Sequence, residues 1–272
     1  MDTCPVCGKG GHPIFSHPEA RILRCDSCGH CFSVVPPENQ EEYDEEYFIK
    51  THRRWFEKPD LGFYLYVSKA IGSRNGRLLD VGCGTGALLS YLHRRHSSLE
   101  LDGIDLSAPG RLEGMRLLQG DFLEYEFDGL YDIITSLHAI EHFGDVRGYI
   151  RRITELARPG AVVIIATAAE NSLLFGLARV FKRLGVSIAT DRLYSKHHLN
   201  HFTTHSLRRL VEDHGLRYRG VLIACPPMAS IDTPETGNAL IDGLLRFSLF
   251  AIHWISNLTG TGYHQTLICE KR

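Results

Sequence analysis

The chain has 272 residues, of which 43% are hydrophobic and 23% are charged, as in ordinary globular proteins. Its length allows one large domain with a smaller appendage, because domains usually have about 100–200 residues. The formal net charge of −2 and the pI of about 6.7 indicate no general attraction to nucleic acid. The first residues show neither the basic stretch nor the apolar run of a secretion signal, so we expect a cytoplasmic protein.

Two pairs of cysteines near the N-terminus have the spacing of a zinc site. Cys4 and Cys7 form the first C-x2-C pair, Cys25 and Cys28 form the second, and 17 residues separate the pairs. Four thiolates would complete a tetrahedral shell, which predicts a structural metal and not a catalytic one. We therefore interpret residues 1–35 as a zinc-binding module, too small to fold without its metal.

Other interpretations of the cysteines stay open. The pairs could be redox-active, Cys31 repeats the spacing after Cys28, and His12 and His30 are spare nitrogen ligands. Three more cysteines lie in apolar runs, where a thiol usually behaves as a small buried hydrophobe: Cys83, Cys225 and Cys269.

A glycine-rich turn lies at the centre of the chain. An apolar run over 77–81 predicts a strand, glycines follow at positions 82, 84 and 86, and residues 87–92 have a helical apolar pattern. Strand, glycine turn and helix together bring bare backbone N–H groups to a ligand at the edge of a sheet. Glycines also mark plain tight turns, so this stretch alone does not decide the function.

Six further apolar runs predict strands over 99–105, 117–122, 131–137, 161–166, 221–225 and 265–270. Asp105 ends the first of them, 25 residues after Asp80, near the spacing of about 20 at which an acid binds ribose. Asp121 comes near the end of the second. Strands that alternate with helical segments predict an α/β fold with a largely parallel sheet.

This ordered series resembles the class I S-adenosylmethionine-dependent methyltransferases. The residues that carry the resemblance are Asp80 to Gly86, Asp105, Asp121-Phe122, Asp132, Glu141-His142 and Arg158-Pro159-Gly160. The resemblance covers Gly76 to Arg272 and implies a Rossmann-like, seven-stranded sheet whose last strand is antiparallel. The domain 76–272 would carry helical insertions at 168–205 and 226–262.

The resemblance also implies S-adenosylmethionine as the cofactor and assigns residues to its parts. Gly82, Gly84 and Gly86 would approach the amino-acid tail and the ribose, where a Cβ would collide. The other expected contacts are Asp80 to the ammonium, Asp105 to the ribose hydroxyls, Leu106 and Leu137 to the nucleoside, and Asp121 and Phe122 to the adenine. Each acid could instead cap the helix that follows its strand.

Residues 36–75 precede the methyltransferase pattern. We expect helical segments here, in an acidic stretch with interleaved aromatic residues. As in the aromatic lead segments of related methyltransferases, Tyr43 and Tyr47 are candidates to cover the cofactor, and plain packing against the sheet is the alternative.

Methyl transfer needs an aligned acceptor and a dry site, with a base only where the acceptor must lose a proton. His138 and His142, expected one helical turn apart, are candidates for that base, and His201 is the alternative. Glu141-His142 resembles part of the metal-binding stretch of ubiquinone-pathway O-methyltransferases. His138 stands where that stretch has its first glutamate, so the presence of a catalytic metal stays open. A purely structural role for Glu141-His142 also stays open.

Two insertions contain apolar helices, over 171–184 and over 239–255. Asp242, Arg246 and His253 interrupt the second, so it is not expected to span a membrane. Either the two insertions pack together, a homodimer interface included, or they form an apolar surface for a membrane or a lipid-bearing substrate.

The combined prediction is a methyltransferase that acts on a small-molecule or glycan acceptor, lipid-linked ones included. O-methylation is favoured over N- or C-methylation. The alternatives are a zinc-containing scaffold with a vestigial cofactor site and a methyltransferase of RNA or protein. A basic patch for nucleic acid is lacking, as is the Tyr-x-x-x-Lys of a nicotinamide enzyme.

Overall fold

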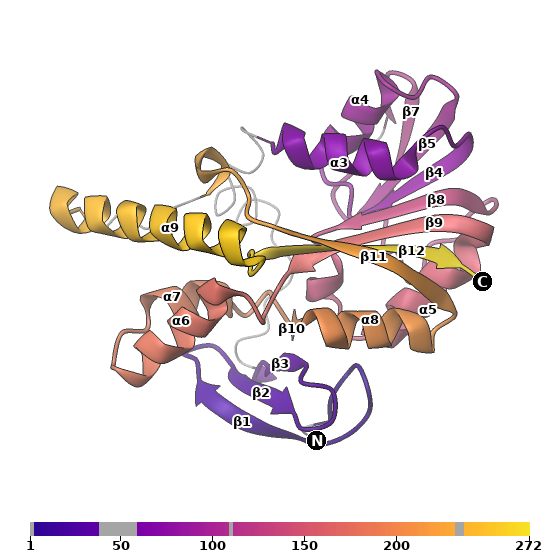
Figure 1. Cartoon of the computed structure of the whole chain (residues 1–272). Coiled ribbons are helices and arrows are strands. Elements are labelled where there is room, and N and C mark those ends of the chain that lie inside the picture. Colours follow the sequence, from indigo (N-terminus) through magenta and orange to yellow (C-terminus); the bar gives the residue numbers. More distant parts are fainter. Residues whose placement is uncertain (1–2, 38–58, 109–110, 232–236) are drawn as a thin grey trace.

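The computed structural model describes residues 3–37, 59–108, 111–231 and 237–272. Most of these residues build one twisted sheet covered by helices on both faces, and a smaller sheet lies beside it (Figure 1). Tyr43 and Tyr47, the expected cofactor cover, lie outside the described residues.

The large sheet has the order β11-β12-β9-β8-β4-β5-β7-β6. Its members are β4 (Gly76–Val81), β5 (Leu99–Asp105), β6 (Arg111–Leu112), β7 (Met115–Gln119), β8 (Tyr131–Leu137), β9 (Ala157–Ala168), β11 (Leu216–Ala224) and β12 (His264–Lys271). β12 is antiparallel to both of its neighbours, β9 and β11. The seven-stranded sheet with an antiparallel last strand is therefore confirmed, and the two-residue β6 extends its other edge.

Alternate side chains of the central strands point into two different apolar cores. Leu79 and Ile134 join the core under α5 (Val146–Leu156) and α8 (Thr204–Asp213). Leu78 and Ile133, one residue earlier on each strand, join the core under α3 (Leu61–Ile71) and α4 (Ala87–His93). Burial on both faces explains why these strands are continuous apolar runs in the sequence.

Several predicted boundaries need correction. The strand expected at 117–122 is β7 and ends at Gln119, so Asp121 and Phe122 follow the strand. The strand expected at 221–225 begins five residues earlier, at Leu216. Cys83 and Cys269 are buried as expected, whereas Cys225 is partly exposed.

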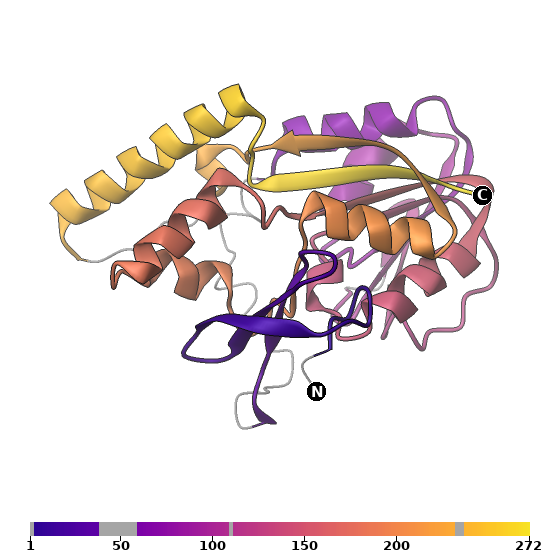
Figure 2. The ribbon, with the colours of Figure 1, turned by 60° about the horizontal axis from the view of Figure 1, so that its bottom comes forward.

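The small sheet combines two distant parts of the chain. β1 (Gly11–Ser16), β2 (Arg21–Cys25) and β3 (Cys31–Val34) form an antiparallel sheet, and β10 (Asn200–His201) pairs with β3 as its fourth strand. Sequence analysis did not foresee β10, because a two-residue strand leaves no periodic pattern. The N-terminal segment is thus joined to the insertion that follows β9, as Figure 2 shows.

The insertions form helices α6 (Leu173–Arg183), α7 (Ile188–Leu193) and α9 (Ala239–Thr259). α9 contacts α6 and extends away from the large sheet (Figures 1 and 2). One face of α9 exposes apolar side chains at successive spacings of four, three, seven and four residues: Leu240, Leu244, Phe247, Trp254 and Leu258. Within the described ranges, no helix is both long and apolar enough to cross a membrane.

A buried carboxylate joins β5 to three other strands at the edge of the large sheet opposite the glycine turn. Asp102 accepts hydrogen bonds from Arg77 Nη2 at 2.9 Å, from Arg116 Nη2 at 2.8 Å and from the Tyr131 hydroxyl at 2.9 Å. Burial alone would raise the pKa of Asp102, but these hydrogen bonds hold it below its ordinary value. Asp102 therefore fastens β5 to β4, β7 and β8.

We expect Asp102→Ala to lower the free energy of unfolding by about 3 kcal/mol at pH 7, because it leaves partly buried guanidinium groups without their carboxylate. Urea unfolding measures the change. Since the folded-state pKa of Asp102 is depressed, its contribution is present above about pH 4 and disappears as the pH falls through the folded value. The difference between the two proteins should shrink in acid.

Glu100→Ala is the matched control, because Glu100 is highly exposed and lies 4.0 Å from Arg77. Its removal should change the free energy of unfolding by less than about 1 kcal/mol. Equal losses in the two variants would contradict a special role for Asp102.

Candidate active site

The glycine turn after β4 adopts a backbone that other residues rarely take. Gly82, Gly84 and Gly86 have φ values of 75°, 49° and 76°. A Cβ on Gly82 would lie 2.6 Å from the Cβ of Ala139, and one on Gly86 would lie 3.0 Å from Leu112 Cδ1. The turn thus presents bare backbone at the carboxyl edge of the sheet, in front of α4.

Asp105, at the end of β5, holds this turn in place. Its Oδ2 accepts a hydrogen bond from the Gly84 N–H at 2.9 Å, and its Oδ1 accepts from the Ser107 N–H at 3.1 Å. The Ser107 hydroxyl donates to the same Oδ1 at 3.1 Å. The carboxylate therefore stands at the mouth of the glycine turn, and its role as a ribose ligand stays a prediction.

Asp80 lies buried beneath the turn. Its Oδ1 accepts a hydrogen bond from the Thr135 hydroxyl at 2.7 Å. Burial raises the pKa of Asp80 to about 7, against the effect of this hydrogen bond and with a contribution from the charge of Asp105. An ionisable group whose pKa lies near neutral pH, at the carboxyl edge of a sheet, is typical of a functional position.

The other residues expected to bind the cofactor differ in their exposure and in their contacts. Leu106 is half exposed beyond β5 and Leu137 ends β8. Asp121 Oδ1 accepts from the Leu123 N–H at 2.8 Å within a turn, and no helix lies among the described residues between β7 and β8, so Asp121 does not cap a helix as the alternative had it. The Phe122 ring is buried against Phe127 and Tyr149, which leaves its backbone, and not its ring, for the nucleoside.

His138 follows β8 and is held by Glu141. It is the one non-glycine residue with a positive φ, 56°, in the part of the chain that the structure describes. Its Nδ1 lies 3.2 Å from Glu141 Oε1. Burial would raise the pKa of Glu141, but the hydrogen bond with His138 and the nearby histidines lower it to about 2. Glu141 is thus a buried carboxylate that orients His138.

His138 and His142 do not share one face of a helix. The expected helical turn over 138–142 is wrong, because only Ile140–His142 form a 3-10 turn and His138 stands before it. His142 Nδ1 donates to the His197 carbonyl at 2.8 Å. His201 is buried in β10 with its Nε2 3.0 Å from the Ser33 hydroxyl, and burial lowers its pKa well below the ordinary value. His201 therefore contacts the small sheet.

The four N-terminal cysteines come together as the spacing predicts. Their sulfur atoms all lie within 4.8 Å of one another, with 3.6 Å between Cys4 and Cys28 and 3.3 Å between Cys7 and Cys25. Among the described residues no other group of three or more histidine, cysteine or acidic side chains gathers so closely. Neither Glu141 and His142 nor the spare ligands Cys31, His12 and His30 belong to such a group.

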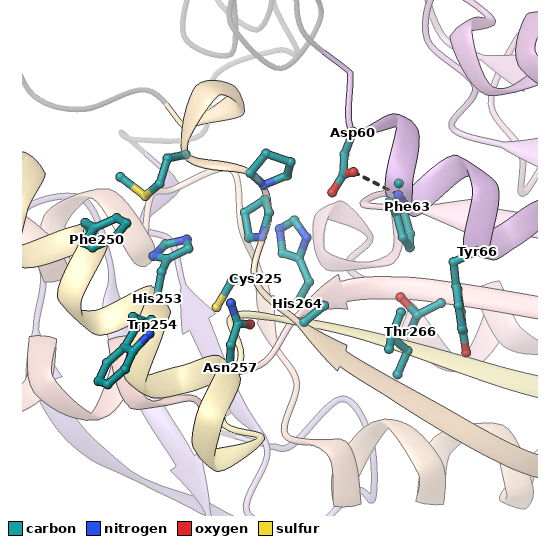
Figure 3. A pocket seen from close by; sticks show the side chains of 16 residues that line it. Asp60, Phe63, Tyr66, Cys225, Phe250, His253, Trp254, Asn257, His264 and Thr266 are labelled. Atoms are coloured by element: carbon teal, nitrogen blue, oxygen red, sulfur yellow. Dashed lines mark hydrogen bonds between the residues drawn. The ribbon is translucent and has the colours of Figure 1, made fainter.

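A cavity of about 470 Å³ opens between α3, α9 and the ends of β11 and β12, and His264 is one of its lining residues. Figure 3 shows His264 between the side chains of α9 and those of α3. The rings of His264 and His138 lie 4.5 Å apart between centroids, so a lining residue of the cavity contacts the residue that follows β8. His264 was not among the residues expected at the site, although the first residue of an antiparallel last strand must lie at the carboxyl edge of its parallel neighbours.

Comparison with known proteins agrees with this geometry. The profile of a methyltransferase domain family matches residues 45–220. A ubiquinone biosynthesis O-methyltransferase of Bordetella bronchiseptica is 29% identical over 170 residues, which cover 53% of this chain and 69% of that protein. Ajmaline N-methyltransferase of Rauvolfia serpentina is 29% identical over 131 residues, covering 41% and 45% of the two chains.

Two solved structures share the fold. Phosphoethanolamine N-methyltransferase 2 of Haemonchus contortus, solved with S-adenosylmethionine, has a TM-score of 0.56 and 16% identity, covering 89% of this chain and 62% of that chain. A chain from the complex of a Haloferax volcanii methyltransferase with the activator Trm112 has a TM-score of 0.59 and 17% identity, covering 85% and 99%. The chain belongs to the methyltransferase domain family and is an S-adenosylmethionine-dependent methyltransferase.

Proposed function

We propose that this enzyme methylates a small-molecule acceptor bound in the cavity lined by His264, with O-methylation favoured over N- or C-methylation. The observation that carries the proposal is the position of the cavity. Its volume of about 470 Å³ lies within the usual range for small-molecule sites, and His264 joins it to the end of β8. The acceptor and the glycine turn would meet at one edge of the sheet.

The residues around the glycine turn suit S-adenosylmethionine, which supplies an electrophilic methyl group. Gly82 and Gly86 leave room where a Cβ would collide with Ala139 or Leu112. Asp80 would face the ammonium of the cofactor, and Asp105 would bind the ribose hydroxyls through lone pairs that Gly84 and Ser107 do not use. Leu106, Leu137, Asp121 and the Phe122 backbone would surround the adenine.

His138 is the proposed base. Because its Nδ1 donates to Glu141, its Nε2 is the basic nitrogen, and Glu141 stabilises the ring after it has gained a proton. Nε2 would take the proton of an acceptor hydroxyl whose oxygen receives the methyl group that the cofactor would supply. His142 and His201 would then position the neighbouring backbone.

The lining of the cavity supports an acceptor with an apolar part. Phe250 and Trp254 line it from α9 and are also 57% and 60% exposed, so the cavity is continuous with the apolar face of α9. The ubiquinone-pathway and ajmaline relatives carry names of enzymes that act on small molecules. A lipid-linked glycan would also suit this lining. Contact with a membrane and dimer formation through α9 stay predictions.

Zinc is the proposed ligand of Cys4, Cys7, Cys25 and Cys28. A tetrahedral site with zinc–sulfur bonds of about 2.3 Å places its sulfur atoms about 3.8 Å apart, close to the observed 3.3 and 3.6 Å. Gly8 and Gly29 follow the pairs with φ values of 72° and 69°, and each N–H donates to the carbonyl of the first cysteine of its pair. Four sulfur ligands leave no open position, so the role of the metal would be structural.

Asp80→Asn tests the ammonium site through stability as well as binding. The folded-state pKa of about 7 exceeds the unfolded value of about 3.9, so ionisation of Asp80 destabilises the cofactor-free protein as the pH rises from 4 to 7. The variant should therefore melt at a higher temperature than the parent, and by more at pH 8 than at pH 5. It should also bind S-adenosylmethionine about tenfold more weakly at pH 8.

Scanning fluorimetry and calorimetric titration give these two readouts. Asp121→Asn removes an exposed carboxylate and should show no pH-dependent gain in stability. A gain for Asp80→Asn that is equal at both pH values, with unchanged cofactor affinity, would contradict the assignment.

The acceptor class is tested by screening small molecules, glycans, RNA and protein substrates for formation of S-adenosylhomocysteine. We expect turnover with small hydroxylated compounds that carry an apolar group, and His138→Gln should lower the rate by about 10²–10⁴ without changing cofactor affinity. Turnover of RNA or protein alone would overturn the proposal. So would full activity of His138→Gln with a hydroxyl acceptor.

A further inference from the structure

The segment 197–202, which we call the strap, lies between the small sheet and the turn 138–143. Toward the small sheet it forms the β10 pairing, in which Asn200 faces Phe32 and His201 faces Cys31. The Ser33 N–H also donates to the Leu199 carbonyl at 2.9 Å. The strap is therefore bound along its backbone to the strand that follows the second cysteine pair.

The opposite side of the strap is bound to the turn 138–143. His142 Nδ1 donates to the His197 carbonyl at 2.8 Å, and the Leu199 N–H donates to the Glu141 carbonyl at 2.9 Å. The side-chain amide of Asn200 donates to the Phe143 carbonyl at 2.7 Å. Three hydrogen bonds thus connect the strap to residues 141–143, which follow His138.

One side chain of the small sheet contacts the strap at two points. The Ser33 hydroxyl donates to the His198 carbonyl at 3.0 Å and accepts from His201 Nε2 at 3.0 Å. Because His201 is buried, water could not easily take the place of this hydroxyl. Loss of the hydroxyl would therefore leave His201 Nε2 without this hydrogen bond. Ser33 therefore holds the strap through its side chain as well as through its backbone.

A second anchor fixes the small sheet beside β9. Arg24 Nη2 on β2 donates to Glu170 Oε2 at 2.9 Å, and the side chain of Glu170 is fully buried. Arg179 of α6 and the Tyr194 hydroxyl also bind this carboxylate. These contacts join the small sheet to Glu170, just after the end of β9. The Glu170 N–H in turn donates to the Phe202 carbonyl in the strap.

We propose that the four-cysteine module positions the acceptor side of the active site, with Ser33 as the positioning residue. Ser33 holds the strap, and the strap holds Glu141 and His142, which set the place of His138. The inference rests on the proposed function in treating the turn 138–143 as the acceptor side. It gives the module a role that a structural metal site far from the reaction would not have.

Hydrogen–deuterium exchange on the full-length, zinc-loaded protein tests this coupling without a known acceptor. In Ser33→Ala, amide exchange in peptides that cover 197–202 and 138–143 should become about tenfold to a hundredfold faster. Peptides that cover 76–105 should stay unchanged. Ser33→Thr keeps the hydroxyl and should restore slow exchange in both segments.

Arg24→Gln is a second variant, because it loosens the module at a different anchor and leaves Glu170 bound to Arg179. It should also speed exchange in the strap and in the turn. Faster exchange confined to residues 3–37, or an equal increase throughout the chain, would overturn the proposal. Calorimetric titration with S-adenosylmethionine on the same samples tests the proposed function separately. Ser33→Ala should bind the cofactor like the parent, whereas a parent protein that does not bind it would contradict the proposed function itself.

Discussion

The hydrogen bonds of the Asp105 carboxylate determine the shape of the active site. One oxygen holds the Gly84 N–H and the other holds Ser107, so the glycine turn after β4 is fixed to the end of β5. The turn itself has positive φ values that only glycine adopts easily. The N–H groups of Gly82 and Cys83 also donate to the Ile104 carbonyl, at 2.8 and 3.1 Å, so the carboxylate adds a side-chain hydrogen bond at Gly84 to a turn whose backbone is already joined to β5.

The other functional parts gather at the same edge because of the strand directions. Parallel β4, β5 and β8 end there, which brings the glycine turn, Asp105 and His138 together. β12 runs the opposite way, so its first residue, His264, reaches this edge and lines the cavity. The insertions supply the outer wall through α9, whose apolar side chains would suit an acceptor with a non-polar portion.

Local patterns predicted the parts of the structure that depend on local chemistry. The strands buried on both faces, the glycine turn and the paired cysteines were visible because burial, positive φ and metal ligation each demand particular residues. β10 was not visible, because two residues carry no periodicity and their pairing with β3 depends on distant chain. The helix expected over 138–142 failed because His138 pairs with Glu141 in a left-handed backbone conformation. The burial of His201 against Ser33 likewise follows from tertiary contact alone.

Calorimetric titration of Asp105→Ala with S-adenosylmethionine tests the central claim, that this carboxylate builds and completes the cofactor site. We expect the affinity to fall at least tenfold to a hundredfold, since hydrogen bonds to a charged group contribute about 1.5–3 kcal/mol. Ser107→Ala is the matched control, because it removes one partner of the carboxylate and leaves the Gly84 hydrogen bond in place. Its affinity should change little. Parent-like binding by folded Asp105→Ala would contradict the account.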